Sequence, residues 1–335
     1  MEIGINFTGT GCALPEATLN NEVLSHLLDT SDEWIVSHTG IRERHLAAST
    51  DSLPQLAIQA GSKALQAANL DGGNLDLIIL ATSTATDLFG DAGIVQAALG
   101  ATKATAFDLT VGCSGFVFGL AVAAQFIRSG MYRNVLLIGA DTLSRWADWS
   151  ERNSCVLFGD GAGALVMQAG LPDGGDSLLA IDLFTDGSKN KILKIPSTSQ
   201  KILSEDNIDL FTNQYEHLQM KGKDVYQFTS QNVPELLRHF LNKANLKIEE
   251  INWFVFHQSN QRILDIIAKK LDLPEHKVLT NIAQCGNTAA ASIPILLNES
   301  IANNKIQAGD LIVTAAYGAG MNFGAAAFYW DYHVQ

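Results

Sequence analysis

A cysteine in the middle of the chain has the setting of an activated nucleophile. Cys113 lies between a short apolar run and the segment 116–127, which is apolar and rich in glycine and alanine. This pattern predicts a strand, a sharp turn and a buried helix that ends near Gly130. Free backbone N–H groups and the helix dipole at such a helix start favour a thiolate. Cys113 is therefore a candidate nucleophile, and a buried structural cysteine is the alternative.

A histidine and an asparagine in the second half of the chain are candidates to act with this cysteine. His257 ends a predicted buried strand, and Asn287 opens a helix start made of small residues. A neutral imidazole and an amide are two donors that can stabilise a developing enolate or oxyanion. Taken alone, His257 fits a hydrogen-bonded core histidine better. Its placement near Cys113 by an internal repeat favours the catalytic interpretation.

The elements that must position these residues occur twice in the chain. The repeat predicts two copies of one α/β unit, each with a buried sheet, packed together. In such a pseudo-twofold arrangement we expect Cys113 and Asn287 to occupy equivalent helix starts and His257 to converge on them. Four segments of the second half echo segments of the first at nearly constant spacing: 251–257 echoes 75–81, 286–292 echoes 112–114, 310–315 echoes 134–139, and 322–327 echoes 160–165.

The repeat also sets the predicted organisation of the chain. Residues 1–170 form the first half with the nucleophile, and residues 225–335 form the second half with the histidine and the asparagine. The segment 171–224 is polar and shows little periodicity, so we expect it to connect the halves with loops that cover a site. The predicted fold class is α/β, with two pseudo-symmetric halves.

Composition excludes several classes of protein. The chain has 335 residues, 47% of them hydrophobic, and a formal net charge of −13, which fits a globular protein with a deep core and not a broad nucleic-acid surface. The first residues lack the pattern of a signal peptide, and the run 116–124 is shorter than the about 20 residues that span a bilayer. The four cysteines are scattered, so we expect reduced thiols, no metal site and a cytoplasmic protein.

Two glycine-rich turns differ in what they can do. The turn 159–163 lacks the Lys-Ser/Thr pair of a phosphate loop and leads into a strand instead of a helix, so we interpret it as structural. The turn 317–321 would let the backbone approach a substrate carbonyl. The backbone N–H groups of Cys113 and Ala319 are therefore the candidates for an oxyanion hole.

Taken together, these motifs resemble the β-ketoacyl-acyl-carrier-protein synthase III family of the thiolase superfamily. The resemblance extends from the N-terminus to about Trp330. It implies a five-layered αβαβα fold, a homodimer, and a catalytic triad of Cys113, His257 and Asn287. The segments that carry it are 30–36, 39–45, 158–163, 257–262 and 286–292.

The resemblance also implies a reaction. Cys113 would take an acyl group from acyl-coenzyme A, and malonyl-carrier protein would then bind and lose carbon dioxide. The resulting enolate, held by His257 and Asn287, would attack the acyl-cysteine. Because decarboxylation supplies the carbanion, no metal or redox cofactor is expected. The expected partners are acyl-coenzyme A, acyl carrier protein and a second copy of the chain.

The same resemblance assigns binding residues. Trp34 and Arg152 would hold the adenine of coenzyme A, Thr30 and Asn260 would line the tunnel, and position 38 would lie near the nucleotide. The segment 258–262 corresponds to the carrier-protein contact region. Arg262 and Lys269 share a helical face with Lys270 beside it, although an ordinary solvated face explains them equally well. The predicted carrier contacts are Gln258, Ser259, Asn260, Gln261, Arg262, Lys269 and Lys270.

Three departures from the family pattern concern the substrate. His38 replaces the usual arginine, which removes a permanent cation near the expected nucleotide. Phe323 stands where the family commonly has tryptophan. Phe89 lies in the acidic segment 87–91. The resemblance implies that this segment shapes the acyl pocket, often from the dimer partner. These departures leave the starter acyl group and the pathway open.

Other activities remain as alternatives. A relative that loads a non-acetyl starter, or that transfers an acyl group to an alcohol or amine, is the nearest; His257 and Asn287 favour decarboxylative condensation. A non-catalytic partner subunit that binds carrier protein commonly lacks the nucleophile, whereas Cys113 is present. A thiolase would be expected to carry a second cysteine near the C-terminus, where this chain has Gly318-Ala319-Gly320. A hydroxymethylglutaryl synthase is the remaining alternative.

Overall fold

The core of the protein consists of two mixed β-sheets. The structure is a computed structural model that describes residues 3–170, 175–205 and 208–330. The first sheet has the strand order β1-β7-β6-β4-β5 and the second the order β13-β14-β15-β8. The first sheet comprises β1 (Ile5–Ala13), β4 (Leu77–Ala81), β5 (Thr105–Leu109), β6 (Asn134–Asp141) and β7 (Gly161–Ala169). The second comprises β8 (Leu178–Thr185), β13 (Trp253–Phe256), β14 (Leu311–Gly318) and β15 (Asn322–Tyr329).

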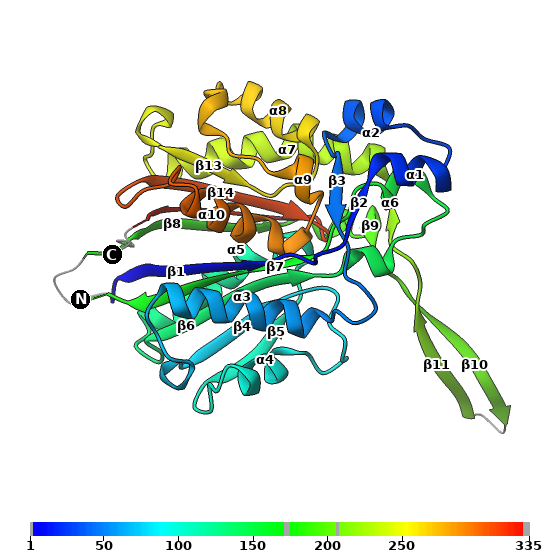
Figure 1. The fold of residues 1–335 in the computed structure, drawn as a ribbon, viewed down its shortest axis with the longest axis horizontal. Coiled ribbons are helices and arrows are strands. Elements are labelled where there is room, and N and C mark those ends of the chain that lie inside the picture. The colour runs from blue at the N-terminus through cyan, green and yellow to red at the C-terminus, as the bar shows by residue number, and fades with distance from the viewer. Residues whose placement is uncertain (1–2, 171–174, 206–207, 331–335) are drawn as a thin grey trace.

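Helices cover both sheets and fill the space between them, which gives five layers (Figure 1). The predicted five-layered α/β fold is therefore confirmed. In the part of the chain that the structure describes, no helix has the length and apolar character needed to cross a membrane. The outer helices are α3 (Leu53–Ala67) and α4 (Ala92–Ala98) on the first sheet and α7 (Gly222–Lys243) and α8 (Gln261–Lys270) on the second; the middle layer holds α5 (Gly115–Arg128) and α10 (Ser292–Ala302).

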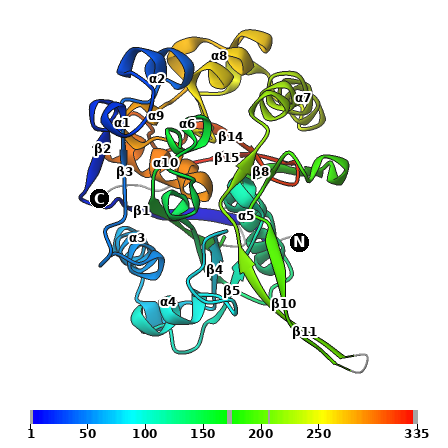
Figure 2. The same ribbon diagram turned by 90° about the vertical axis from the view of Figure 1, so that its right-hand side faces the viewer.

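The middle layer is apolar because both of its faces are buried. Figure 2 looks along this layer and shows α5 and α10 between the sheets. Phe116 and Leu120 of α5 are almost fully buried, and each such side chain contributes about 1.5–3 kcal/mol of hydrophobic stabilisation. Gly119 lets the helix approach the sheet, since a methyl group there would lie 2.5 Å from a side-chain carbon of Leu137. The helix ends as predicted, with Gly130 at φ +77°.

The two halves repeat each other element by element. In the sheets, β4, β6 and β7 of the first half correspond to β13, β14 and β15 of the second, in the same order. A three-residue 3₁₀ turn opens each middle helix: η2 (Gly112–Ser114) precedes α5, and η7 (Ala289–Ala291) precedes α10. The first residue of each turn has a positive φ, +55° at Gly112 and +47° at Ala289. The predicted duplication is therefore present in the structure.

The turns correct one sequence expectation. Cys113 is the middle residue of η2, and the middle residue of η7 is Ala290. Asn287 precedes η7 instead of lying within it, so Cys113 and Asn287 do not occupy equivalent positions. The small-residue run after Gly286 obscured the alignment, because several of its registers resemble the run after Gly112.

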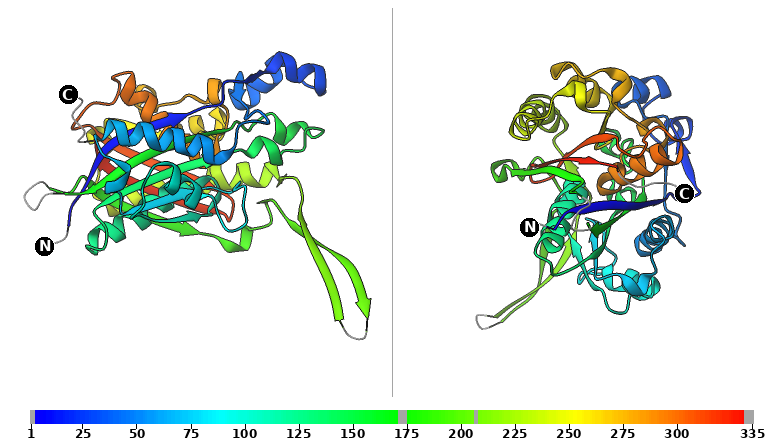
Figure 3. Two further views of the ribbon diagram at one scale, coloured as in Figure 1. Left: turned by 60° about the horizontal axis from the view of Figure 1, so that its bottom comes forward. Right: turned by 90° about the vertical axis from the view of Figure 1, so that its left-hand side faces the viewer.

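The segment 171–224 contains more regular structure than its polar sequence suggested. Strand β8 lies within it and completes the second sheet by pairing antiparallel with β15. A long hairpin, β10 (Ser197–Glu205) with β11 (Ile208–Tyr215), then leaves the body of the protein (Figure 3). Short strands β9 (Leu193–Lys194) and β12 (Gln219–Met220) pair at its base. Strand β8 belongs to the second half, so that half begins before the predicted boundary at residue 225.

A helical segment near the N-terminus is held to the body of the first half by a buried arginine. It contains β2 (Thr18–Asn20), α1 (Asn21–Leu27), α2 (Asp32–Thr39) and β3 (Glu43–His45). Arg44 is fully buried, and its guanidinium donates to the Asn21 side chain and to the carbonyl of Val156. Burial lowers the pKa of Arg44 to about 10. Separately from these bonds, α2 contacts α8 of the second half.

Candidate active site

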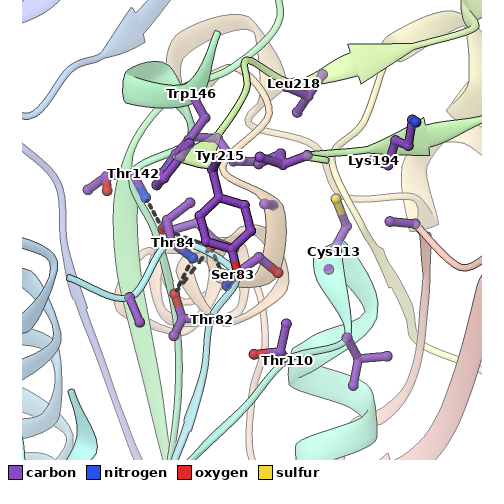
Figure 4. A pocket seen from close by; sticks show the side chains of 18 of the residues that line it. Thr82, Ser83, Thr84, Thr110, Cys113, Thr142, Trp146, Lys194, Tyr215 and Leu218 are labelled. Carbon is purple, nitrogen blue, oxygen red and sulfur yellow. Dashed lines mark hydrogen bonds between the residues drawn. The ribbon is translucent and has the colours of Figure 1, made fainter. Parts of the chain in front are cut away.

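Cys113 opens onto a large cavity. The cavity has a volume of about 850 Å³ and lies where the ends of β4 and β6 meet η2 and the loops of 193–218. Figure 4 shows the Cys113 sulfur at its wall, with Tyr215 and Trp146 also lining it. Cys113 is half-buried. The turn before α5 therefore presents the sulfur to a space large enough for a substrate, as the sequence predicted.

The protonation state of Cys113 differs from the sequence expectation. Burial, together with the charge of Asp141, raises the pKa of the Cys113 thiol to about 12, although a hydrogen bond with its own backbone lowers it. Desolvation thus outweighs the helix start, which was expected to favour a thiolate. A thiol with a pKa raised this far is protonated at neutral pH.

The end of β14 approaches the nucleophile closely. A methyl group built on Gly318 would lie 2.9 Å from Cβ and 3.1 Å from the backbone nitrogen of Cys113. Next to it, Ala319 lies against η2, since a methyl group on Gly112 would be 3.3 Å from the Ala319 Cβ and 3.5 Å from its nitrogen. The two backbone nitrogens proposed for an oxyanion hole, those of Cys113 and Ala319, therefore belong to segments in contact.

His257 is held as a neutral imidazole. It follows β13 directly, is almost fully buried, and its Nδ1 lies 2.7 Å from the Ser292 hydroxyl. Its ring meets the edge of the Tyr317 ring at a centroid distance of 5.4 Å. Burial lowers the pKa of His257 to about 3. The imidazole can therefore act as a neutral hydrogen-bond donor, but does not carry a charge at neutral pH.

Asn287 has one end of its amide fixed. Its backbone is tied to the loop before β7, where Asn287 N–H donates to Leu157 and Gly159 N–H donates to Asn287. Its side-chain Oδ1 accepts from the Ala289 N–H at 2.9 Å. This bond leaves Nδ2 as the part of the amide that can donate to a ligand.

The three predicted catalytic residues are joined through shared neighbours. Phe158, which lines the Cys113 cavity, forms an isolated parallel bridge with Asn287. Tyr317, which packs on His257, is followed by Gly318 at the Cys113 turn. His257 and Asn287 themselves do not line the cavity. The first half thus supplies a thiol at the cavity wall. The second half supplies two neutral donors, which lie outside the cavity lining.

The residues predicted to bind coenzyme A gather on the second-half side, around α2. The His38 ring stacks on Trp34 at 4.4 Å, and the Arg152 guanidinium lies 5.1 Å from the Trp34 ring. The Asn260 side chain donates to the His38 carbonyl. Thr30 follows Asp29, whose carboxylate lies 3.6 Å from Arg152. In the described part of the chain, the buried Thr30 hydroxyl has no hydrogen-bond partner. The sequence predicted this grouping, but not that His38 would cover Trp34.

The predicted carrier-protein contacts divide into buried and exposed residues. Gln258 is 0% exposed, and its amide bonds to Phe256 and Thr280, so its assignment as a surface contact is wrong. Gln258 is buried because it lies between the buried end of β13 and the start of α8. Ser259 is bonded to the Tyr317 hydroxyl. Arg262, Lys269 and Lys270 remain exposed. Asp265 and Asp272 line the same surface hollow as Lys269, whereas Arg262 and Lys270 do not line it.

Phe89 does not reach the cavity of its own chain. It is 98% exposed, whereas its neighbours Asp87 and Leu88 line the cavity rim. The turn that carries it is well supported: Asp91 accepts from Thr86, and Asp108 accepts from the N–H groups of Asp91 and Ala92. The Phe89 side chain therefore lies outside the Cys113 cavity of its own chain.

Several residues of the site were not predicted. Ser292 bonds to His257, Gly318 touches Cys113, and the buried carboxylate of Asp141 lines the cavity. Ser292 and Gly318 lie inside motifs that the sequence singled out, but side-chain contacts between distant segments were needed to assign them. The turn at Asp160 is structural as predicted, since β7 begins at Gly161 and the Asp160 carboxylate accepts from Ser144.

Comparison with known proteins gives a consistent set of relatives. Residues 107–187 match the family described as 3-oxoacyl-[acyl-carrier-protein (ACP)] synthase III, and residues 241–330 match its C-terminal region. The chain is 52% identical over 330 residues to the β-ketoacyl-[acyl-carrier-protein] synthase III of Trichormus variabilis, with 98% of each covered.

Solved structures agree with these sequence relatives. The crystal structure of 3-oxoacyl-[acyl-carrier-protein] synthase III from Aquifex aeolicus is 41% identical, covers 97% of this chain and all of its own, and has a TM-score of 0.88. The priming β-ketosynthase of the R1128 polyketide biosynthetic pathway is 27% identical, with 98% of this chain and 97% of its own covered and the same TM-score.

Proposed function

The chain belongs to the β-ketoacyl-[acyl-carrier-protein] synthase III family, and we propose that it condenses an acyl group from acyl-coenzyme A with malonyl-carrier protein to initiate fatty-acid synthesis. The observation that carries the proposal is a pair of contacts made by the end of β14. Gly318 lies against Cys113, and the residue before it, Tyr317, packs on His257. Two neighbouring residues of β14 thereby link the nucleophile of the first half to a neutral donor of the second half.

The first half-reaction transfers the acyl group to Cys113. The sulfur attacks the thioester carbonyl, the bond to coenzyme A breaks, and the thiol proton ends on the coenzyme A sulfur. The raised pKa of the Cys113 thiol means that this proton leaves during the attack instead of beforehand. The backbone N–H groups of Cys113 and Ala319 stabilise the oxyanion that forms on the carbonyl oxygen.

The second half-reaction makes the new carbon–carbon bond. The malonyl thioester loses carbon dioxide, and the electron pair of the broken bond forms an enolate. Nε2–H of His257 and Nδ2–H of Asn287 donate to the enolate oxygen, a task that suits the lowered pKa of the imidazole. The enolate carbon attacks the acyl-cysteine, and the Cys113 sulfur leaves and recovers a proton. Because decarboxylation generates the nucleophile, this sequence needs no metal or redox cofactor.

The surface around α2 and α8 supports the approach of both substrates. Arg152, Trp34 and the Thr30 hydroxyl, which has no hydrogen-bond partner among the described residues, form the site for the nucleotide end of coenzyme A. The carrier protein docks through the exposed cations of α8, chiefly Arg262 and Lys270, because the carboxylates near Lys269 offset its charge. The negative net charge of the chain makes such a local patch necessary for an acidic partner.

A homodimer in the cytoplasm is part of the proposal. Strand β5 is the edge of the first sheet, and an unpaired edge is a ready template for a second copy. The rigid turn that holds Phe89 outward supports insertion of this ring into the acyl pocket of the partner subunit. The choice of starter acyl group would then depend on residues of both subunits.

A second function within the same chemistry is the priming of a specialised pathway with a non-acetyl starter. The observation that favours it is His38, which packs on Trp34 and offers no permanent cation to the nucleotide. The likeness to a polyketide priming ketosynthase at 27% identity is compatible with it.

Intact-protein mass spectrometry after incubation with a panel of acyl-coenzyme A thioesters tests the proposal. We expect one adduct, located on Cys113 and absent from Cys113→Ala, and release of the acyl group as a β-ketoacyl product when malonyl-carrier protein is added. Cys285→Ala is the matched control, since Cys285 is buried away from the cavity. An adduct on Cys113→Ala, or none on the wild type with any thioester, would refute the assignment.

A further inference from the structure

The Ser292 hydroxyl is the polar group that faces the second nitrogen of the His257 ring. Ser292 is the first residue of α10 and is 2% exposed. Its Oγ lies 2.7 Å from Nδ1 of His257, a short hydrogen bond between two buried groups. Ser292 thus contacts the residue proposed to hold the enolate.

The direction of this hydrogen bond follows from the other partner of the serine. The backbone N–H of Gln258 points at Ser292 Oγ at 3.4 Å, and a backbone N–H can only donate. The serine oxygen therefore acts as an acceptor on that side. In the described part of the chain, no acceptor other than Nδ1 is found for the hydroxyl proton. The hydroxyl thus donates to Nδ1 of His257.

We propose that Ser292 is a positioning residue that fixes His257 in the tautomer with its proton on Nε2. An imidazole whose Nδ1 accepts a hydrogen bond must, when neutral, carry its proton on Nε2. Nε2–H is the donor that the decarboxylation step requires, and Nδ1–H would face the wrong way. The low pKa of the buried ring, about 3, keeps it neutral, so the tautomer alone decides whether it can donate. This inference rests on the proposed function for its catalytic consequence.

The backbone also fixes the orientation of the ring. The His257 N–H donates to the Ala315 carbonyl at 2.9 Å, which holds the residue after β13 against β14. The Tyr317 ring meets the imidazole edge-on at 71°, and its hydroxyl is tied to Ser259. Packing therefore sets the plane of the ring, whereas the Ser292 hydrogen bond sets which nitrogen carries the proton.

The direct test is the imidazole ¹⁵N spectrum of the full chain labelled at histidine. The chain has eight histidines, and the signals of His257 are identified by their loss in His257→Ala. We expect the Nε2–H form in the wild type and a mixture of both forms in Ser292→Ala. A wild-type spectrum with the proton on Nδ1 would overturn the proposal without any further variant of Ser292.

Kinetics separate positioning from a general structural role. Ser292→Ala should acylate Cys113 within about twofold of the wild type but decarboxylate malonyl-carrier protein about tenfold more slowly, the worth of one buried hydrogen bond. Ser292→Cys fills the same space with a weak donor and should show the same split, whereas Ser292→Thr should restore most of the rate. Ser300→Ala, a buried serine on the same helix, is the matched control.

Two outcomes would contradict the proposal. An equal loss of acylation and decarboxylation in Ser292→Ala and Ser292→Cys would make the serine merely structural. Rates within twofold for both steps, with an unchanged spectrum, would make its hydroxyl irrelevant. Failure of the proposed function itself is distinguishable, because a wild-type chain that releases no carbon dioxide would still report the tautomer of His257.

Discussion

The two turns that open the middle helices, η2 and η7, have the same backbone but opposite surroundings. Each turn is met by the strand end of the other half: β6 ends at Asp141 beside η7, and β14 ends at Gly318 beside η2. The Asp141 carboxylate accepts from the N–H of Ala290, the middle residue of η7, at 3.1 Å. Gly318, which has no side chain, lies against Cys113, the middle residue of η2.

This difference shows how a duplicated scaffold divides its tasks. In η7 the turn N–H is satisfied by a carboxylate, so the turn is purely structural and carries an alanine. In η2 the corresponding strand end is Gly318, which has no side chain to accept from the Cys113 N–H. The second half contributes the donors instead, from the residue after β13 and from the loop before η7. Catalysis therefore uses non-equivalent positions of two equivalent units.

The largest expected effect is the loss of stability when the Asp141 carboxylate is removed. Asp141→Ala leaves the buried N–H groups of Ser83 and Ala290 without their acceptor, so we expect a loss of about 3 kcal/mol in the free energy of unfolding. Chemical denaturation measures this loss, and Asp265→Ala, an exposed carboxylate on α8, should change stability by less than about 0.5 kcal/mol. Equal stability of the two variants would mean that Asp141 does not hold η7.

A side chain at Gly318, the strand end beside η2, should lower the acylation rate of Cys113. Gly318→Ala puts a methyl group 2.9 Å from the Cys113 Cβ, so the turn must move, and we expect acylation to slow about a hundredfold. Stopped-flow or mass-spectrometric acylation rates measure this effect. Gly187→Ala, where a methyl group meets open space, should acylate normally. Normal acylation by Gly318→Ala would show that the two strand ends are interchangeable.

The reactivity of Cys113 tests whether the surroundings of η2 favour a thiol or a thiolate. Because burial and Asp141 raise the thiol pKa to about 12, the thiolate fraction grows about tenfold for each pH unit between 7 and 10. The rate of Cys113 alkylation by iodoacetamide should rise accordingly, with no plateau in that range. A plateau near pH 8 would mean that η2 stabilises the thiolate as the sequence alone suggested. Cys113→Ala corrects the measured rate for the other cysteines.

The smallest expected effect is a change in the KM for acyl-coenzyme A. It arises at the proposed nucleotide site, which lies away from η2 and η7. His38→Arg adds a permanent cation beside Trp34 at an exposed position, so we expect the KM for acyl-coenzyme A to fall about fivefold with kcat unchanged. His26→Arg, at an exposed position of α1, is the matched control. An unchanged KM for His38→Arg would place the nucleotide elsewhere.

Sequence reasoning found the duplication because buried strands and glycine-rich turns recur at regular spacing. It singled out Cys113 and His257 because each adjoins an apolar element, and Asn287 because it opens a helix start made of small residues. It paired Cys113 with Asn287 wrongly, since a run of small residues aligns in several registers. It also missed β8, whose polar surroundings hide a strand that finds its partner only in the folded sheet.

The electrostatics could not be predicted from local pattern. The helix start at Cys113 suggested a low pKa, but desolvation depends on the second sheet, which closes over the turn. Gln258 looked like a surface residue because polar residues surround it, and only the core around β13 shows that it is buried. Ser292 was visible as the end of a motif, but its contact with His257 joins two segments distant in the chain.

The most direct test of the division of labour is to follow both half-reactions in His257→Ala. The variant is incubated with acyl-coenzyme A, its mass is recorded, and carbon dioxide released from labelled malonyl-carrier protein is then counted. We predict a normal acyl adduct on Cys113 and a loss of carbon dioxide release of at least about a hundredfold. Full release of carbon dioxide, or a loss of the acyl adduct, would contradict the assignment of the two steps to two halves of the molecule.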